Sequence, residues 1–363
     1  MKLLFYIYCI SAGGAERVMV NLANQFATHG HSICFVTNIL ERQEYELDRR
    51  IDRVNFEYKK KETNRFVKNC RQIFSLRRQI KKVKPDIVIS FMPENSFRAA
   101  VANCYCSSKL LLSVRNDPEK EYYGWFRKVA AYIFFRLADG VVFQTPNAMK
   151  WFPKVIRNKS RIILNQVSES FFDSEYKGEY TGIVTAGRLV KQKNHAMLIK
   201  AFFKVKDICN DNLIIYGGGL KTENIKDELI KLTQDLGIEA RVVFAGETAN
   251  LNQIMASAKM FVLSSDYEGL PNALMEAMAL GLPCVSTDCP CGGPDILLEQ
   301  GRAGILTPVG DEGKLAEVLK LLLSDINLLN DLAIKARLRA ENFRPEKIFE
   351  QWNDYVRYLL NNK

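Results

Sequence analysis

The 363-residue sequence is poor in the groups that build several common kinds of site. Its only histidines, His29, His31 and His195, are scattered, which argues against a histidine-centred metal site or catalytic triad. It contains no Asp-x-Asp motif, which argues against the usual metal–diphosphate clamp. It also lacks the G-x4-G-K-[ST] phosphate loop and the G-x-S-x-G nucleophile elbow. We therefore expect a site without a bound metal.

Long apolar segments and paired cysteines are also absent. No stretch reaches the roughly 18 uncharged apolar residues that a membrane span needs. The apolar run after Lys2 and the small residues from Ser11 mimic a short signal peptide. We interpret the run as a buried strand, because a helix and a second strand follow it. The nine cysteines are odd in number and too few for a disulfide scaffold, so we expect free thiols in a reducing cytosol.

The remaining composition is that of a globular protein. The length, with 47% hydrophobic and 25% charged residues, predicts two domains with a core each. The net charge of +10 is uneven, because residues 1–170 hold 29 Lys and Arg against 15 Asp and Glu, and residues 171–363 hold 22 against 26. A basic first half indicates an anionic partner, which is a nucleic acid, a membrane surface or a phosphorylated ligand, unless it is simply a soluble basic face.

Strand and helix patterns alternate along both halves, which predicts two doubly wound α/β domains with parallel sheets. Short apolar runs predict strands at 3–10, 33–37, 86–91, 109–114, 140–144 and 161–164, and, after a polar linker at 168–181, at 183–186, 212–216, 241–245, 260–264 and 283–287. Ligands of such sheets bind at the carboxyl ends of the strands. We therefore expect the site in a cleft between the two domains.

Two loops at predicted strand ends carry glycines or cations. Gly13 and Gly14 precede a helix, where they serve either a tight turn or the approach of an anion to the helix N-terminus. Arg188 and Lys193 follow the 183–186 strand and suit a diphosphate, Arg188 as a bidentate fork and Lys193 as a point charge. Lys191 competes for either role, and by composition alone a solvated surface loop is the simpler interpretation.

The segment SDYEGLPNALMEA at 265–277 is the most informative. Pro271 stands where a first helical turn should start, which puts Glu268 in the loop before the helix and Glu276 inside it. Glu276 follows Glu268 by eight residues, and eight residues of a helix correspond to a rotation of about 80° around its axis. Both carboxylates can therefore face the same cleft without touching each other. Alternatively, Glu268 partners the helix dipole and Glu276 is a surface glutamate, although its neighbours are apolar.

Together these residues resemble the family 4 retaining glycosyltransferases of the GT-B fold. The E-x7-E pair is the most specific match, and SAGGAER at 11–17, the loop from Gly187 to Lys193 and GRAGILTPVGD at 301–311 match in the same order. The resemblance spans nearly the whole chain and implies two facing Rossmann-like domains with a central cleft. Residues 1–170 would face the acceptor and the membrane, residues 171–345 would bind the nucleotide sugar, and the helix at 346–363 would return to the first domain.

The resemblance also implies residue roles. Arg188 and Lys193 would hold the nucleotide diphosphate, Glu268 the donor sugar and Glu276 the ribose hydroxyls. The catalytic residues would be Glu268, Arg188 and Lys193; the donor-binding residues Gly13, Gly14, Gly187, Gly218, Gly246, Gly269, Leu270, Pro271 and Glu276; and the acceptor-side residues Asn95, Arg115 and Asn116. Similar enzymes need no metal or cofactor beyond the UDP-sugar donor, and their diphosphate takes the acceptor's proton.

The sequence departs from the family pattern in three places. Gly217–Leu220 reads GGGL where many relatives have Gly-Asp-Gly-Pro, and Asn165 is followed by Gln166 where many have proline. Arg115 stands where many have histidine and is the candidate for part of its role. The RNDP variant at 115–118 resembles bacterial capsule, lipopolysaccharide and N-glycan enzymes, which often use UDP-GalNAc or UDP-galactose.

Two basic helices are predicted in the first half, at 65–84 and 121–138, and the second is rich in aromatic residues. Both suit an anionic bilayer surface, unless the aromatics fill the core and the cations are solvated.

The predicted function is therefore transfer of GalNAc, Gal, Glc or GlcNAc from a UDP-sugar to a growing, lipid-linked glycan of a bacterial surface polysaccharide, by a cytoplasmic protein peripheral on the inner membrane face. The alternatives are a soluble family 4 transferase with a small-molecule or glucan acceptor, and a basic nucleic-acid-binding protein. No helix-turn-helix or RNP-like signature is present, so we expect no nucleic-acid partner.

Overall fold

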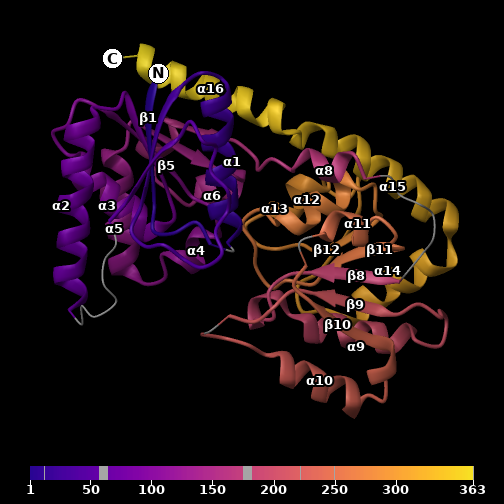
Figure 1. Ribbon diagram of the computed structural model, residues 1–363. Coiled ribbons are helices and arrows are strands. Elements are labelled where there is room, and N and C mark those ends of the chain that lie inside the picture. The colour runs from indigo at the N-terminus through magenta and orange to yellow at the C-terminus, as the bar shows by residue number, and fades with distance from the viewer. Residues whose placement is uncertain (12, 57–63, 175–181, 221, 249, 363) are drawn as a thin grey trace. The chain divides into compact units, whose positions relative to one another are not determined.

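The computed structural model describes residues 1–363 except 12, 57–63, 175–181, 221, 249 and 363 (Figure 1). The chain forms two compact units, one of Met1–Asn165 with Glu346–Lys363 and the other of Gln166–Pro345. The sequence places the first boundary after residue 170, whereas the units divide after Asn165. Within the described ranges, no helix is both long enough and apolar enough to cross a bilayer.

The first unit is built on a seven-stranded sheet with the order β3-β2-β1-β4-β5-β6-β7, in which all neighbours are parallel. The strands are β1 (Lys2–Ile7), β2 (Ser32–Thr37), β3 (Asp52–Asn55), β4 (Ile87–Phe91), β5 (Lys109–Ser113), β6 (Gly140–Phe143) and β7 (Ser160–Ile162). Strands β1 and β4 are buried almost throughout, as expected of apolar runs in the middle of a parallel sheet. The winding direction reverses between β1 and β4, so this pair marks the switch point at which doubly wound sheets bind ligands.

Helices cover both faces of this sheet (Figure 1). They are α1 (Gly14–Thr28), α2 (Arg65–Val83), α3 (Pro93–Asn103), α4 (Pro118–Glu121), α5 (Trp125–Leu137), α6 (Pro146–Lys150), α7 (Lys154–Arg157) and α16 (Pro345–Asn361). The prediction of one helix at 121–138 is wrong at its start. Gly124 has φ +86°, which ends the short helix α4 and lets α5 begin at Trp125.

Helix α16 completes the core of the first unit. Its apolar side chains recur at helical spacing, and Phe349, Trp352 and Val356 join Phe5 of β1 in one buried cluster. The Tyr355 hydroxyl donates to the Lys159 carbonyl at 2.5 Å, which ties the helix to the end of the sheet.

The second unit has a six-stranded parallel sheet with the order β10-β9-β8-β11-β12-β13. Its strands are β8 (Ile183–Ala186), β9 (Leu213–Tyr216), β10 (Val242–Gly246), β11 (Met260–Leu263), β12 (Cys284–Thr287) and β13 (Ile305–Thr307). Its helices are α8 (Glu169–Phe172), α9 (His195–Val205), α10 (Lys226–Asp235), α11 (Leu251–Met255), α12 (Asn272–Ala279), α13 (Gly293–Leu297), α14 (Glu312–Ser324) and α15 (Ile326–Ala340). Here the winding reverses between β8 and β11.

Two α/β domains with parallel sheets are therefore confirmed. The predicted linker at 168–181 is partly wrong, because α8 occupies its start; its residues 175–181 lie outside the described part of the chain.

Candidate functional site

The loops that follow β8 and β11 are bonded together at the switch point of the second unit. The Asp266 N–H donates to the Gln192 carbonyl at 2.9 Å, and Gln192 Nε2 donates to the Tyr267 carbonyl at 2.8 Å. Asn194 Nδ2 donates to Asp266 Oδ1 at 2.7 Å. These bonds fix the loop that carries Arg188 and Lys193 against the loop that carries Glu268, so residues about 75 positions apart in sequence share one edge of the sheet.

Glu268 and Lys193 form an ion pair within these loops. Glu268 Oε1 accepts from Lys193 Nζ and also from Ser265 Oγ, the latter at 2.7 Å. Only 14% of the Lys193 side chain and 9% of the Glu268 side chain are exposed, so both charges are largely removed from water. An ammonium group has three donors, so Lys193 can keep this bond and still bind an anion. The ion pair gives Glu268 a specific charged partner, and its alternative role as a partner of a helix dipole stays a prediction.

Glu276 lies in the second turn of α12, surrounded by buried apolar residues such as Met275 and Ala277. It is 5% exposed, so the alternative of a surface glutamate is wrong. The helix begins at Asn272, and Pro271 is its N-cap.

Glycines allow three strand ends of the second unit to approach one another. The Gly187 N–H donates to the Tyr216 carbonyl at 2.9 Å, and the Gly217 N–H donates to the Gly246 carbonyl at 2.8 Å. Gly217 has φ +132°, and a Cβ there would lie 2.0 Å from the Gly187 carbonyl oxygen. The Gly218 carbonyl accepts from the Leu189 N–H at 2.8 Å. The predicted glycines Gly187, Gly218 and Gly246 thus lie together at one edge.

The structure adds one close approach that the sequence reasoning misses. A Cβ on Gly293 would lie 1.9 Å from the Gly269 carbonyl oxygen, so α13 starts directly against the backbone beside Glu268. Leu270 and Pro271, which follow Gly269, are both buried. The signal for this approach was the double glycine in CPCGGPD at 289–295.

Arg188 is the exposed cation of this site. Among the described residues, no carboxylate is paired with its side chain, and its carbonyl accepts from His195 Nε2 at 3.2 Å. Burial lowers the pKa of His195 to about 4, so the imidazole is neutral at neutral pH. Lys191 is also exposed, and its N–H donates to Glu223 Oε1 at 2.8 Å. Besides the paired ammonium of Lys193, the site therefore offers an anion the exposed guanidinium of Arg188 and the exposed ammonium of Lys191.

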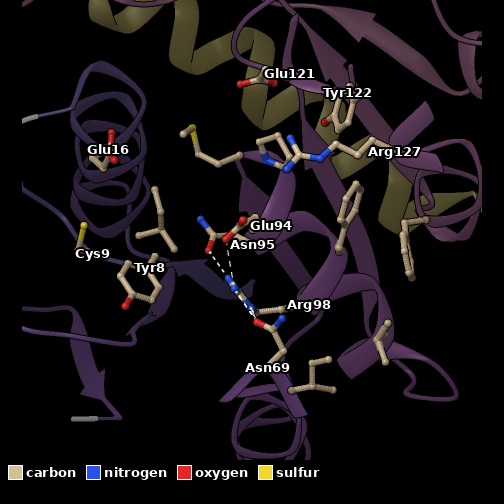
Figure 2. A pocket seen from close by; sticks show the side chains of 17 residues that line it. Tyr8, Cys9, Glu16, Asn69, Glu94, Asn95, Arg98, Glu121, Tyr122 and Arg127 are labelled. Carbon is tan, nitrogen blue, oxygen red and sulfur yellow. Dashed lines mark hydrogen bonds and ion pairs between the residues drawn. The ribbon is translucent and has the colours of Figure 1, made fainter. Parts of the chain in front are cut away.

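In the first unit, a cavity of about 620 Å³ lies at the switch point between β1 and β4 (Figure 2). Tyr8 and Cys9 line it beyond the end of β1, and Asn95 lines it from the start of α3. Asn95 Nδ2 donates to the Phe91 carbonyl at 3.2 Å, and its Oδ1 accepts from Arg98 Nη1 at 3.4 Å. The predicted acceptor-side residue Asn95 is thus part of a cavity wall.

The other predicted acceptor-side residues do not line this cavity. Arg115 is 8% exposed; its Nη2 donates to Asn165 Oδ1 at 2.5 Å, and its guanidinium lies 4.5 Å from the Phe91 ring centroid. Burial lowers the pKa of Arg115 to about 9, which leaves it cationic at neutral pH. Asn116 is half-buried. At the end of β1, Gly13 is the N-cap of α1 and Gly14 its first residue.

Metal ligands do not cluster in the described ranges, where no group of three or more His, Cys, Asp or Glu could hold an ion.

Comparison with known families matches both units. The model of glycosyltransferase family 4 matches residues 12–170, and that of glycosyl transferases group 1 matches residues 181–325. The chain belongs to this family of glycosyltransferases.

Relatives of this glycosyltransferase act on bacterial glycans. It is 26% identical to the GalNAc-α-(1→4)-GalNAc-α-(1→3)-diNAcBac-PP-undecaprenol α-1,4-N-acetyl-D-galactosaminyltransferase of Campylobacter jejuni, over 99% of both chains. It is 25% identical to the lipopolysaccharide core biosynthesis glycosyltransferase LpsE of Rhizobium meliloti, over 88% of both chains. Among solved structures, HepE of Anabaena in complex with UDP and glucose has a TM-score of 0.83 at 18% identity, over 99% of this chain and 100% of that one. The fold is that of the GT-B glycosyltransferases.

Proposed function

We propose that this glycosyltransferase moves one hexose or N-acetylhexosamine from a UDP-sugar to a lipid-linked glycan during assembly of a bacterial surface polysaccharide. The observation that carries the proposal is the largely buried Lys193–Glu268 pair at the β8/β11 switch point, with the exposed Arg188 on the same loop as Lys193 and the buried Glu276 on the helix that follows Glu268. The Campylobacter jejuni and Rhizobium meliloti relatives, whose names specify an undecaprenol-linked glycan and a lipopolysaccharide core, support the acceptor class.

The proposed chemistry retains the configuration of the donor sugar and needs no metal. Arg188 binds the diphosphate, and Lys193 adds a second positive charge while its bond to Glu268 keeps the carboxylate in place for the sugar hydroxyls. Glu276 accepts from the ribose hydroxyls. The acceptor oxygen bonds to the anomeric carbon as the bond to the diphosphate breaks on the same face, and the acceptor's proton moves to the departing diphosphate oxygen.

Transfer in excess EDTA tests this chemistry. We expect full activity with a UDP-sugar and a polyprenyl diphosphate-linked glycan, and a product with the anomeric configuration of the donor by nuclear magnetic resonance. The cations of the site meet the charge that develops on the diphosphate, so a divalent ion is not required. Activity that is lost in EDTA and restored only by Mg²⁺ or Mn²⁺, or a product of inverted configuration, would contradict the mechanism.

We further propose that the first unit binds an anionic membrane surface from the cytoplasmic side. Helix α3 contacts both α2 and α5, and all three expose apolar side chains. On α5, Trp125 and Phe126 are 65% and 73% exposed, and their rings stack at 3.9 Å. On α2, Phe66 and Phe74 are exposed beside basic residues of the same helix. Aromatic side chains next to cations suit the interface of an anionic bilayer.

Charge reversal on α2 is expected to abolish binding to anionic vesicles. The variant changes Arg78, Lys81 and Lys82 to Glu, because these side chains are exposed and each cation near an anionic leaflet contributes about 1 kcal/mol. Arg77 stays unchanged, because its Nη1 donates to the carbonyls of Ala102 and Cys104 and braces the end of α3. Co-sedimentation across a salt series measures the effect.

The matched control reverses three exposed cations of the second unit, Lys231, Arg302 and Lys320, and should bind vesicles like the wild-type protein. Binding of the wild-type protein to anionic vesicles should fall as the salt concentration rises. Any vesicle binding that persists at high salt would come from insertion of Trp125 and Phe126. Equal binding to neutral and anionic vesicles would contradict the electrostatic explanation. Absence of binding to either would favour the soluble transferase.

A further inference from the structure

Both aromatic and polar side chains line the cavity of the first unit. Phe97, Tyr122 and Phe134 contribute aromatic rings from α3, the end of α4 and α5. The charged lining residues are three glutamates and two arginines, namely Glu16, Glu94, Glu121, Arg98 and Arg127. Carbohydrate sites commonly pair such surfaces, because a sugar ring has apolar C–H faces and a rim of hydroxyls.

Arg98 is already neutralised within the cavity wall. It is 8% exposed; its Nη2 donates to Asn69 Oδ1 at 2.9 Å and lies 3.3 Å from Glu94 Oε2 (Figure 2). Three carboxyl groups and two arginines line the cavity, and the ion pair with Glu94 compensates the charge of Arg98. The lining therefore has no excess of cations that would select a phosphate, and its mixture of polar and aromatic groups suits a neutral polyhydroxyl ring.

Glu121 is a polar lining residue with a buried oxygen that lacks a partner. Its Oε2 is shielded from solvent and has no hydrogen bond within the described part of the chain. The backbone at Glu121 is well fixed, because its N–H donates to the Asp117 carbonyl at 3.0 Å and the next residue, Tyr122, is buried against Phe97 and Trp151. Glu121 as a whole is half-buried, but a carboxyl oxygen buried without a partner is costly in the free protein, and a ligand hydroxyl would remove that cost.

Burial, with a smaller contribution from the charge of Asp117, raises the pKa of Glu121 to about 8. The group is then mostly protonated at neutral pH. A neutral carboxyl both donates and accepts a hydrogen bond, as a sugar hydroxyl does, and it does not repel an uncharged ring.

We propose that Glu121 is a positioning residue for the acceptor, which hydrogen-bonds a hydroxyl of a neutral sugar ring held in the β1/β4 cavity. This inference rests on the proposed function and adds a residue that the sequence did not indicate. Glu121 holds the ring from α4, while the aromatic side chains cover its apolar face.

The test compares acceptor kinetics with acceptor-independent hydrolysis of the UDP-sugar, using polyprenyl diphosphate-linked glycans that end in an uncharged sugar. Glu121→Ala should raise the KM for the glycan about tenfold, because a buried hydrogen bond is lost, and should leave donor hydrolysis unchanged. Glu121→Gln should stay within about threefold of the wild-type KM, because the amide donates and accepts like the neutral carboxyl. Glu119→Ala, on the exposed side of the same helix, is the matched control.

Ile73→Trp fills the cavity from α2 without changing Glu121, and it should also raise the KM while hydrolysis persists. This variant keeps the inference testable if Glu121→Ala does not fold. An unchanged KM in folded Glu121→Ala or folded Ile73→Trp overturns the inference. Wild-type protein that hydrolyses no UDP-sugar, or that elongates no lipid-linked glycan, would instead contradict the proposed function.

Discussion

Replacement of Glu268 by glutamine is expected to lower the rate of sugar transfer at least tenfold while the protein stays folded. The carboxylate accepts from Lys193 and from Ser265, and glutamine keeps its shape but loses its charge. A charge-assisted hydrogen bond contributes about 1.5–3 kcal/mol, which corresponds to at least a tenfold change in rate. The variant also leaves the Lys193 ammonium largely buried without its counter-charge.

Steady-state transfer assays and thermal unfolding together measure this effect. Glu276→Ala should lower turnover strongly in the same assay, because the proposed contact with the ribose is lost. Glu317→Gln is the matched control, since Glu317 is an exposed carboxylate of α14 far along the chain from the site loops. Near wild-type rates in both Glu268→Gln and Glu276→Ala would reject the assignment of these two carboxylates.

The central strands could be predicted from the sequence because parallel strands at the middle of a sheet are continuous apolar runs. The predicted 183–186 strand coincides with β8, and the predicted 33–37 strand lies within β2. The edge strand β3 was missed because its sequence, DRVN, is polar and only partly buried. Helix α3 was missed because its first turn, PENS, reads as a loop, although proline at the first position is typical of a helix start.

The sequence indicated which residues of the second unit are candidates for the site, but it did not indicate the contacts between their side chains. Their positions at predicted strand ends and their spacing indicated Arg188, Lys193 and Glu268 as candidate site residues. The family resemblance supplied the roles proposed for them. The ion pair between Lys193 and Glu268 could not be read from the sequence, because it depends on β8 and β11 being neighbours in the sheet.

Glu121 was missed for a local reason. The sequence predicted a single basic helix at 121–138, in which Glu121 was one of several charged residues and did not stand out. The signals for a short separate helix were present, with Asp117 as N-cap, Pro118 at the first position and Gly124 before α5. Only the structure shows that this helix ends at a cavity wall.

Replacement of Arg188 by alanine is expected to weaken UDP binding at least tenfold. The guanidinium is exposed at the carboxyl end of β8, and its loss removes a bidentate, charge-assisted contact to the diphosphate that is worth about 1.5–3 kcal/mol. Arg188→Lys should restore only part of the affinity, because an ammonium group lacks the planar fork. Arg302→Ala, which removes another exposed cation of the second unit, should bind UDP like the wild-type protein.

We propose that the diphosphate of a UDP-sugar lies against the loops after β8 and β11. Calorimetric titration of UDP in the presence of EDTA, with wild-type protein and the Arg188→Ala variant, tests this placement of the diphosphate. We predict saturable binding to the wild-type protein and at least tenfold weaker binding to the folded variant. An unchanged affinity in Arg188→Ala would place the diphosphate elsewhere, with Lys191 as the next candidate, and no binding of UDP to the folded wild-type protein would contradict the claim altogether.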